Sequence, residues 1–355
     1  MNKIVLTGGG TAGHVIPNIA LIPYLQDRGY DIYYMGTKNG IENELISQLP
    51  EIEYYSVKSG KFRRYLDIKN ISDPFRVLYG VGQSANIIKK LKPSVVFSKG
   101  GFVSVPVVMG AWLNNVPVVV HESDLTPGLA NKIATKFAKK VCTTFPETVE
   151  HFKEGKAIHT GTPIRPELLK GNKDFGLSIC KFNTKKPIVL IIGGSLGAVA
   201  INQGIRNILK KLLTKFQVIH ICGKGNIDNS LLEVKGYRQF EYVGDELPHL
   251  MAAADIVVSR AGANAIHELL ALRKPALLIP LPLSASRGDQ IYNAKSFERQ
   301  GFSKVLFQED MTEDLLYSAI LDLYRNKAMY VHNMESHDIK NSIEMIIDII
   351  DECTK

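Results

Sequence analysis

The chain has 355 residues, of which 45% are hydrophobic and 22% charged, a balance typical of folded globular proteins and not of disordered chains. Its longest nearly apolar stretches, at 103–113 and 275–283, are far shorter than the roughly 20 residues that a membrane-crossing helix needs. The formal net charge is +8, and residues 1–165 hold 20 Lys and Arg against 13 Asp and Glu. This charge suits nucleic acid, an anionic membrane surface or a phosphorylated substrate, and does not choose among them.

The chain enters a strand-like segment directly after Met1, without the basic and apolar regions of a signal peptide. Its four cysteines form no C-x-x-C pair and have no histidines at the spacing of a zinc site. We therefore expect a protein that works in the cytoplasm with reduced thiols, without a bound metal or other cofactor.

Short runs of β-branched residues alternate with segments of helical period along the whole chain. They are KIVLT, DIYYMG, PSVVFSKG, VPVVVHES and KKVCTTF in the first half, and PIVLII, FQVIHICG, FEYVG, DIVVSRAG, PALLIPL and SKVLFQED in the second. The spacing leaves room for a crossover helix between successive strands, so each half is predicted to be a doubly wound, Rossmann-like α/β domain.

The domain boundary is predicted near GTPIRP at 161–166, where a glycine and two prolines interrupt the pattern. We predict a first domain at 1–163, a second at 164–340, and a final helix within 341–355 that returns to the first domain. Open α/β sheets bind ligands at the carboxyl ends of their strands. The two domains are therefore expected to face one another across a cleft.

The first predicted strand ends in a glycine-rich turn, Gly8 to His14, directly before a helical segment. Gly8, Gly10 and Gly13 have G-x-G-x-x-G spacing, which lets backbone amides approach an anionic ligand at a helix N-terminus. A dinucleotide site also needs an acidic residue at the end of the second strand, and DIYYMGTKNG ends without one. A ligand-binding turn is therefore favoured over an NAD site, with a purely structural turn as the other alternative.

The second half repeats this arrangement, because GGSLGA at 193–198 follows the strand PIVLII and precedes another helix. Backbone amides and the Ser195 hydroxyl of this turn can donate hydrogen bonds to a diphosphate. Further along, Glu268 lies in a helix after another strand, where its carboxylate can accept two hydrogen bonds from a ribose diol. A solvated surface glutamate is the alternative. The polar segment 286–290 follows one more strand, so these segments together predict a nucleotide site.

Seven segments, in this order, resemble the MurG type of GT-B glycosyltransferases, the UDP-N-acetylglucosamine:undecaprenyl-diphosphoryl-muramyl-pentapeptide N-acetylglucosaminyltransferases. They are GGGTAGHVIP at the N-terminus, SKGGFVSVP at 98–106, HESDLTPGLANK at 121–132, GTPIR at 161–165, GGSLGA at 193–198, SRAGANAIHEL at 259–269 and DQIYNA at 289–294. The resemblance implies inverting transfer of N-acetylglucosamine to the muramyl 4-hydroxyl of undecaprenyl-diphosphate-linked N-acetylmuramoyl pentapeptide. That step converts lipid I to lipid II in peptidoglycan synthesis, and so connects the chain to cell shape and division.

The resemblance also implies which residues bind the donor nucleotide, most of them in the second domain. The turn at Ser195 is expected to hold the diphosphate, and Arg165 to contact the nucleotide. The backbone near Val243 is expected to read uracil, and Glu268 to hold the ribose hydroxyls.

Contacts with N-acetylglucosamine are implied for a further set of polar or backbone groups, namely Thr11, Ala12, Gly13, Asp124, Asp289 and Gln290. Asp124 replaces an asparagine that many relatives carry, so it accepts hydrogen bonds without an amide to donate. Phe102 replaces a tyrosine that some relatives carry, which removes a hydroxyl group at that position.

His14 is the candidate general base. Inverting glycosyl transfer needs a base to deprotonate the acceptor hydroxyl while the departing UDP gains negative charge. An imidazole, with an ordinary pKa of about 6.5, accepts a proton near neutrality. A helix-capping or substrate-binding role is the alternative for His14, and His121 and Glu122 are reserve candidates for the base. The chain has no D-x-D triplet, so the amides at 194–197 are expected to stabilise the leaving group without an obligatory metal ion.

A lipid-linked acceptor implies work at the cytoplasmic face of the cell membrane, as a peripheral protein. The segment KFRRYL at 61–66 mixes cations with apolar rings, and a helical segment after it carries Phe75 and Tyr79 on one face. An anionic leaflet is therefore the expected partner, and nucleic acid is not. The residues assigned to this membrane and acceptor side are Lys61, Phe62, Arg63, Arg64, Phe75 and Tyr79. Ordinary core packing is the alternative.

Three rival functions remain. A UDP-N-acetylglucosamine 2-epimerase of the same fold shares the donor site but needs no lipid acceptor. A non-catalytic UDP-sugar-binding protein binds the donor without turnover. An NAD oxidoreductase binds NAD in preference to the UDP-sugar.

Overall fold

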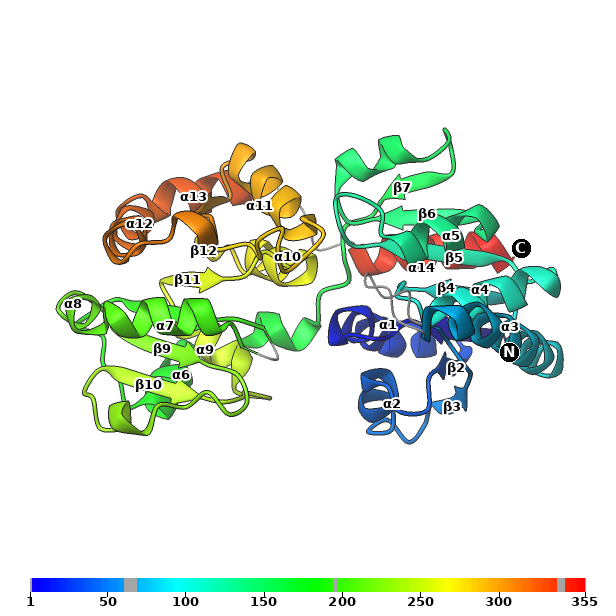
Figure 1. Cartoon of the computed structure of the whole chain (residues 1–355), viewed down its shortest axis with the longest axis horizontal. Coiled ribbons are helices and arrows are strands. Elements are labelled where there is room, and N and C mark those ends of the chain that lie inside the picture. The colour runs from blue at the N-terminus through cyan, green and yellow to red at the C-terminus, as the bar shows by residue number, and fades with distance from the viewer. Residues whose placement is uncertain (1, 61–68, 195–196, 337–341, 355) are drawn as a thin grey trace. The chain divides into compact units, whose positions relative to one another are not determined.

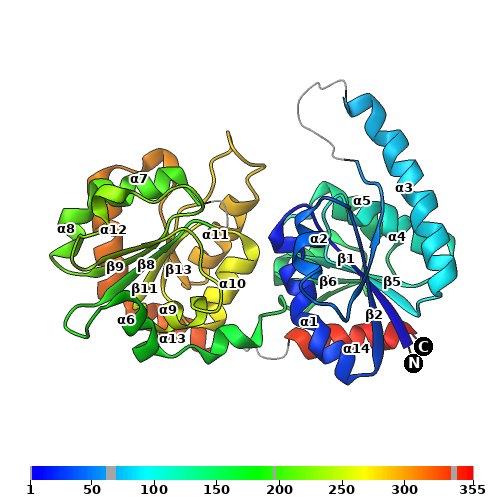
Figure 2. The same ribbon diagram turned by 90° about the horizontal axis from the view of Figure 1, so that it is seen from below.

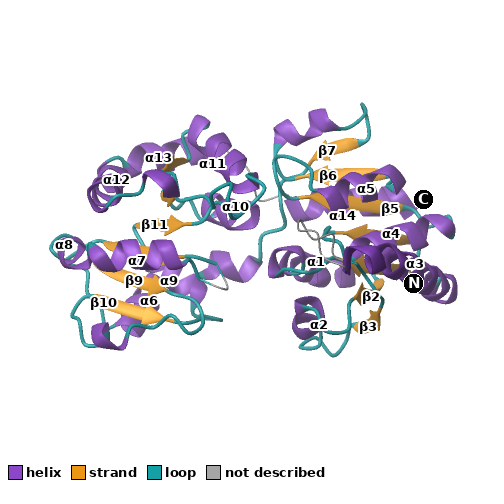
Figure 3. Ribbon diagram, in the orientation of Figure 1, coloured by secondary structure: helices purple, strands orange, loops and turns teal. Residues whose placement is uncertain are grey.

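The computed structural model describes residues 2–60, 69–194, 197–336 and 342–354, with side chains from residue 75 onward in the helix that begins at Lys69. The chain divides into two compact units (Figure 1). Unit 1 comprises Met1–Ile164 and Ile339–Lys355, and unit 2 comprises Arg165–Asp338. Figure 3 shows that each unit contains a layer of strands with helices packed around it.

Among the described residues, unit 1 contains one sheet of seven parallel strands in the order β3-β2-β1-β4-β5-β6-β7. The strands are β1 (Asn2–Thr7), β2 (Tyr30–Gly36), β3 (Glu53–Ser56), β4 (Val95–Ser98), β5 (Val118–Glu122), β6 (Lys140–Thr143) and β7 (Ala157–His159). The helices are α1 (Ile16–Asp27), α2 (Ile41–Ile46), α3 (Lys69–Leu91), α4 (Ser104–Leu113), α5 (Leu129–Phe137) and α14 (Ser342–Thr354), with 3-10 turns η1 (Ala12–His14) and η2 (Pro146–His151).

Both faces of the unit 1 sheet are buried, which explains why its central strands read as continuous apolar runs. Ile4 and Leu6 of β1 belong to a core that includes α1 and α14, and Val5 belongs to a second core that includes α3, α4 and α5. Ile346 and Ile350 of α14 have no exposed surface. The last helix of the chain is therefore part of the unit 1 core.

Unit 2 contains six parallel strands in the order β10-β9-β8-β11-β12-β13 within its described residues. The strands are β8 (Ile188–Ile192), β9 (Gln217–Ile221), β10 (Tyr237–Phe240), β11 (Ile256–Ser259), β12 (Ala276–Leu278) and β13 (Ser303–Val305). The helices are α6 (Lys173–Cys180), α7 (Val199–Asn207), α8 (Leu209–Leu213), α9 (Leu247–Ala253), α10 (Ala263–Ala271), α11 (Asp289–Arg299), α12 (Glu313–Arg325) and α13 (Lys327–Glu335), with 3-10 turns η3 (Pro166–Lys170), η4 (Asn229–Leu231) and η5 (Gln308–Asp310). The prediction of two doubly wound α/β domains is confirmed.

The strand predictions need three corrections, for two strands that were missed and one that was misplaced. The strands β3 and β7 were not predicted, because each is a short edge strand whose side chains are only partly buried. FEYVG was predicted as a strand, but β10 ends at Phe240, which pairs with Ile221 of β9. The two residues after it, Glu241 and Tyr242, are exposed and belong to a loop. Among the described helices, none combines the length and hydrophobicity that crossing a bilayer requires.

Candidate active site

Two glycine loops meet at the carboxyl edge of the unit 1 sheet, where β1 lies next to β4 and the winding direction reverses. The Gly9 amide donates to the Gly100 carbonyl at 3.4 Å. Gly101 has φ of +81°, and a Cβ on it would strike the Gly9 carbonyl. The close approach of the two loops therefore requires glycine at 101.

His14 ends the turn η1, which connects the first glycine loop to α1. Its Nδ1 lies 3.1 Å from the Thr11 hydroxyl oxygen, and the imidazole is half-buried. A Cβ on Gly101 would lie 3.3 Å from the same Nδ1, so the second loop also contacts this ring. Ala12 and Gly13, predicted to contact the sugar, belong to the same turn. The turn thus places the candidate base and three predicted sugar-binding residues together.

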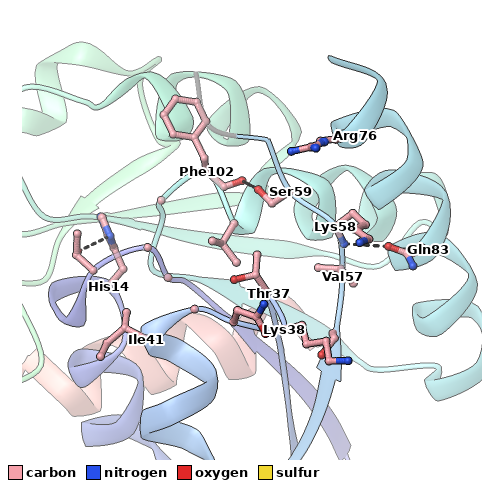
Figure 4. A pocket seen from close by; sticks show the side chains of 18 residues that line it. His14, Thr37, Lys38, Ile41, Val57, Lys58, Ser59, Arg76, Gln83 and Phe102 are labelled. Carbon is pink, nitrogen blue, oxygen red and sulfur yellow. Dashed lines mark hydrogen bonds between the residues drawn. The ribbon is translucent and has the colours of Figure 1, made fainter. Parts of the chain in front are cut away.

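A pocket of about 1130 Å³ opens beside this turn, and His14 lines it. Its wall includes three cationic residues that the sequence analysis did not single out, Lys38, Lys58 and Arg76. In the view of Figure 4, His14 lies on one side of the pocket and both Lys58 and Arg76 lie on the other. Cations around a pocket of this size suit a phosphorylated organic ligand.

The wall formed by residues 57–60 is tied to two other elements (Figure 4). The Lys58 amide donates to Oε1 of Gln83 in α3 at 2.9 Å. The Ser59 hydroxyl donates to the Phe102 carbonyl, in the second glycine loop, at 2.8 Å. This wall directly follows β3, so the position of Lys58 at the carboxyl edge of the sheet depends on that short strand.

Glu42, in the first turn of α2, is a further residue that was not predicted from the sequence. Its side chain is fully buried. Its Oε2 accepts a hydrogen bond from the Gly10 amide at 3.1 Å, and its Oε1 accepts from the Thr37 amide at 3.0 Å. The only sequence signal was a carboxylate that follows Gly40 closely after the second strand.

His121, a reserve candidate for the base, is buried at the end of β5. Its Nε2 lies 2.9 Å from the Gly161 carbonyl, to which it can only donate, so Nδ1 is the acceptor for the Lys99 ammonium at 2.8 Å. Lys99 also donates to the Ser123 hydroxyl. Burial lowers the pKa of Lys99 to about 7, against the opposing effect of the Glu122 charge. Both nitrogens of the His121 ring therefore have hydrogen-bond partners, and they connect the residue after β4 to the segment after β7.

Glu122, the other reserve candidate, supports the loop after β5. Its carboxylate accepts from the amides of Asp124 and Gly128 at 2.9 and 3.1 Å, and from Nδ2 of Asn131 at 2.9 Å. Burial, and then the charge of Asp124, raises the pKa of Glu122 to about 7. Its hydrogen bonds fix the backbone at Asp124, which is half-buried.

The loop after β8 in unit 2 repeats the glycine geometry. Gly194 and Gly197 have φ of +89° and +75°, and a Cβ on Gly197 would strike the Cys222 carbonyl. That carbonyl also accepts from Nδ2 of Asn202 in α7 at 2.9 Å. The ends of β8 and β9 and the start of α7 are therefore packed tightly together. Ser195, predicted to hold the diphosphate, lies outside the described residues.

Arg165 and Glu268, predicted separately as nucleotide-binding residues, form an ion pair at 3.4 Å between Nη2 and Oε1. Their side chains are 34% and 19% exposed. Burial raises the pKa of Glu268, and the Arg165 charge opposes this shift. Nε of Arg165 is buried and has no hydrogen-bond partner among the described residues. A buried donor without a partner is costly, so this pair is suited to a further polar ligand.

The other predicted donor-site residues of unit 2 lie on loops and helix starts at the same edge of its sheet. Asp289 and Gln290 begin α11. Oε1 of Gln290 accepts from the Leu281 amide at 3.0 Å, and Asp289 forms an ion pair with Arg287 at 3.0 Å. Val243 is buried in the loop after β10.

The predicted membrane side is described only in part. Phe75 and Tyr79 of α3 are 72% and 63% exposed, and Leu78 between them is 63% exposed. Figure 2 shows the first half of α3 extending beyond the rest of unit 1. Lys61, Phe62, Arg63 and Arg64 lie outside the described residues. The described part of this side is thus a projecting helix that carries large apolar side chains.

Comparison with known proteins identifies the class of this fold and site. A model of the glycosyltransferase family 28 N-terminal domain matches residues 4–143, and one of the glycosyltransferase family 28 C-terminal domain matches residues 188–349. The crystal structure of Acinetobacter baumannii MurG has a TM-score of 0.79 and 26% identity, over 99% of this chain and 100% of that one. A UDP-GlcNAc 2-epimerase from Neisseria meningitidis, bound to UDP-GlcNAc, has a TM-score of 0.69 over 99% of this chain and 100% of that one, but 15% identity, which shows the fold alone. The chain is a glycosyltransferase of the GT-B fold.

A closer relative identifies the family. A protein of Clostridium novyi (strain NT) is 57% identical over 354 residues, 99% of each chain, and is named UDP-N-acetylglucosamine--N-acetylmuramyl-(pentapeptide) pyrophosphoryl-undecaprenol N-acetylglucosamine transferase. This chain belongs to that family, the MurG glycosyltransferases, which confirms the resemblance found in its sequence.

Proposed function

We propose that this chain transfers N-acetylglucosamine from UDP-N-acetylglucosamine to the undecaprenyl-diphosphate-linked N-acetylmuramyl pentapeptide. The observation that carries the proposal is the 57% identity, along its full length, to a relative named for this transfer. The glycine loops, His14 and the pair of Arg165 and Glu268 all lie at carboxyl edges of parallel sheets, where such folds bind ligands. The reaction makes one bond to the acceptor hydroxyl and breaks the bond between the sugar and UDP.

Unit 2 binds the donor in this proposal. Its loop after β8 supplies amides, and Ser195 a hydroxyl, to the diphosphate. The Glu268 carboxylate accepts hydrogen bonds from the ribose diol, and Arg165 provides the charge and the Nε donor that meet the nucleotide. Val243, Asp289 and Gln290 contribute contacts with the base and the sugar, and Asp124 in unit 1 accepts from the sugar.

The pocket of unit 1 holds the polar head of the acceptor. Lys58 and Arg76 face this pocket, and two positive charges match the diphosphate that connects the muramyl group to its lipid. The projecting part of α3, with Phe75 and Tyr79, contacts the anionic leaflet in which that lipid is held. The enzyme then acts at the cytoplasmic face of the membrane as a peripheral protein.

His14 is the general base. Its imidazole takes the proton of the muramyl 4-hydroxyl as the oxygen bonds to the anomeric carbon of the sugar, which inverts that centre. The electron pair of the breaking bond leaves with UDP, and the amides at 194–197 stabilise the new charge. Thr11 orients the imidazole through the contact at 3.1 Å between its hydroxyl and Nδ1.

The test is transfer of labelled N-acetylglucosamine to a short-chain, lipid-linked muramyl pentapeptide by the purified chain. Acceptor-dependent formation of the disaccharide product supports the proposal. An epimerised sugar formed without acceptor would establish the 2-epimerase instead. Binding of UDP-N-acetylglucosamine without any product would establish a sugar-nucleotide-binding protein, and thermal stabilisation by NAD rather than by the UDP-sugar would indicate an oxidoreductase.

A further inference from the structure

The first glycine loop holds an anion that belongs to the protein itself. The Glu42 carboxylate accepts from the Gly10 amide with Oε2, and from the Thr37 amide and hydroxyl with Oε1, at 3.1, 3.0 and 2.5 Å. Gly10 and Glu42 are 32 positions apart in the chain. This fully buried side chain therefore connects the loop after β1 to the loop after β2.

Glycines make room for this carboxylate. A Cβ on Gly9 would lie 2.5 Å from Cδ of Glu42, and a Cβ on Gly40 would strike the same carboxylate. Thr37 is also held from the other side, because the Tyr54 hydroxyl donates to its carbonyl at 2.7 Å. The loops are thus shaped around the side chain of Glu42.

In Rossmann-type nucleotide sites, the amides of the first glycine loop donate to a ligand's phosphate. Here the Gly10 amide donates to Glu42. Hydrogen bonds to an ionised carboxylate are roughly twice as strong as neutral ones, so they hold the loop before any ligand arrives. The residues that follow Gly10 directly are Thr11 to His14, the turn that carries the proposed base.

We propose that Glu42 is a positioning residue for glycosyl transfer: it replaces an external anion at the first glycine loop and holds the turn that carries His14 in its reactive arrangement. This inference rests on the proposed role of His14. Glu42 does not line the described pocket wall, and it acts through Gly10.

The test compares the full-length enzyme with Glu42→Gln, Glu42→Ala and a matched control, Glu44→Gln, whose side chain is exposed on the same helix. A glutamine of equal size has one carboxamide oxygen, so it must present an N–H to either Gly10 or Thr37. We expect kcat of Glu42→Gln to fall by about 10- to 100-fold, the equivalent of losing a hydrogen bond to a charged group. The Kd for UDP-N-acetylglucosamine, measured by calorimetry, is expected to rise by a smaller factor than kcat falls, because the turn at Thr11 to Gly13 is predicted to contact only the sugar and unit 2 to bind the nucleotide.

Two further measurements separate positioning from a structural role. Formate is expected to restore part of the kcat of Glu42→Ala in a concentration-dependent way, because it can replace the missing carboxylate. In spectra of labelled histidine, the His14 ring resonances are expected to shift in Glu42→Gln and not in Glu44→Gln. The His14 ring resonances are recorded without substrate turnover. A wild-type enzyme without transfer activity would therefore contradict the proposed function, while the spectra would still test whether Glu42 positions His14.

The inference is overturned if Glu42→Gln keeps the kcat of Glu44→Gln, or if the His14 resonances are the same in both variants. A parallel loss of kcat, donor affinity and folded fraction, without rescue by formate, would assign Glu42 to stability only. Should Glu42→Ala fail to fold, the kinetics and spectra of Glu42→Gln decide the matter.

Discussion

Nη2 of Arg165 lies 3.4 Å from Oε1 of Glu268, although 103 positions separate the two residues in the chain. Arg165 directly follows the end of the first unit 1 segment, and Glu268 lies in α10. Burial raises the pKa of the Glu268 carboxyl group, and the nearby positive charge of Arg165 lowers it. In the proposed function both side chains contact the nucleotide, so the ionisation of the Glu268 carboxylate governs donor binding.

Replacement of Glu268 by alanine is expected to weaken UDP-N-acetylglucosamine binding by about 10- to 100-fold. The variant loses the charged acceptor for the ribose diol, a net loss of roughly 1.5–3 kcal/mol, and leaves Arg165 without its partner. Calorimetric titration with the donor measures the change, with Glu298→Ala, an exposed position in α11, as the control. An unchanged Kd would remove Glu268 from the nucleotide site.

The same site predicts a pH dependence. Burial raises the pKa of Glu268. In the folded protein this carboxyl group therefore takes up its proton at a higher pH than an exposed glutamate does. Only the ionised form offers both oxygens as acceptors to a ribose diol. Donor affinity is therefore expected to fall as the pH is lowered through this raised pKa, and Glu268→Gln is expected to flatten that part of the profile. If donor affinity depended on pH equally in the wild type and in Glu268→Gln, Glu268 would not be the group that binds the ribose.

His14→Ala is expected to lower kcat by roughly 100-fold or more, the usual contribution of a general base, with little change in the Kd for the donor. The acidic limb of the kcat profile, which reports protonation of the base, should disappear in the variant. Steady-state transfer assays between pH 5.5 and pH 9 give kcat and its pH profile. This interval includes the ordinary histidine pKa of about 6.5. His332→Ala is the control, since that side chain is 84% exposed. Turnover close to the wild-type value would exclude His14 as the base.

The projecting part of α3 is expected to bind anionic vesicles. Replacing Phe75 and Tyr79 together by serine removes two large exposed side chains and should reduce flotation with phosphatidylglycerol-containing liposomes by several-fold, without loss of solution binding to the donor. Leu315→Ser, at a position 49% exposed on α12, controls for the loss of any surface apolar group. Flotation that matches this control would refute a membrane role for α3.

Unit 2 is expected to lose stability in acid through His220. The ring is buried, its Nδ1 lies 2.8 Å from the Tyr237 hydroxyl and its Nε2 lies 2.9 Å from Oδ1 of Asn202. Burial, and then the charge of Arg206, lowers the pKa of His220 to about 3. Between about pH 6.5 and 3 the unfolded chain binds a proton that the folded chain does not, so stability falls as the pH falls, by up to about 1.4 kcal/mol per pH unit.

Thermal unfolding of the wild type and of His220→Asn across pH 4 to 7 tests this account. The variant is less stable at pH 7 because it loses the buried hydrogen bonds, and the gap in Tm is expected to narrow as the pH falls. His332→Asn, on an exposed ring, should follow the wild type at every pH. A gap that is constant with pH would show that folding does not lower the pKa of His220.

Much of this protein follows from local sequence. Alternating β-branched runs and helical periods determined two doubly wound domains, because strands buried on both faces must be apolar along their length. The glycines within 8–13 and 193–197 marked two loops, since close backbone approach and positive φ, as at Gly10 and Gly194, exclude most other residues. His14 and Glu268 could be named because they adjoin such loops or strand ends, whereas Arg165 was named only through the resemblance to the family.

Only the tertiary structure decided which of these groups meet. The pairing of Arg165 with Glu268, the contact of Glu42 with Gly10 and the pocket beside His14 depend on side chains brought together by strand order, and local periodicity carries no information on that order. The short edge strand β3 was not recognisable because its side chains are half solvated, and with it the position of Lys58 was lost. No sequence motif distinguishes Glu42 from other helix glutamates, and its burial against two backbone amides is a property of the assembled sheet alone.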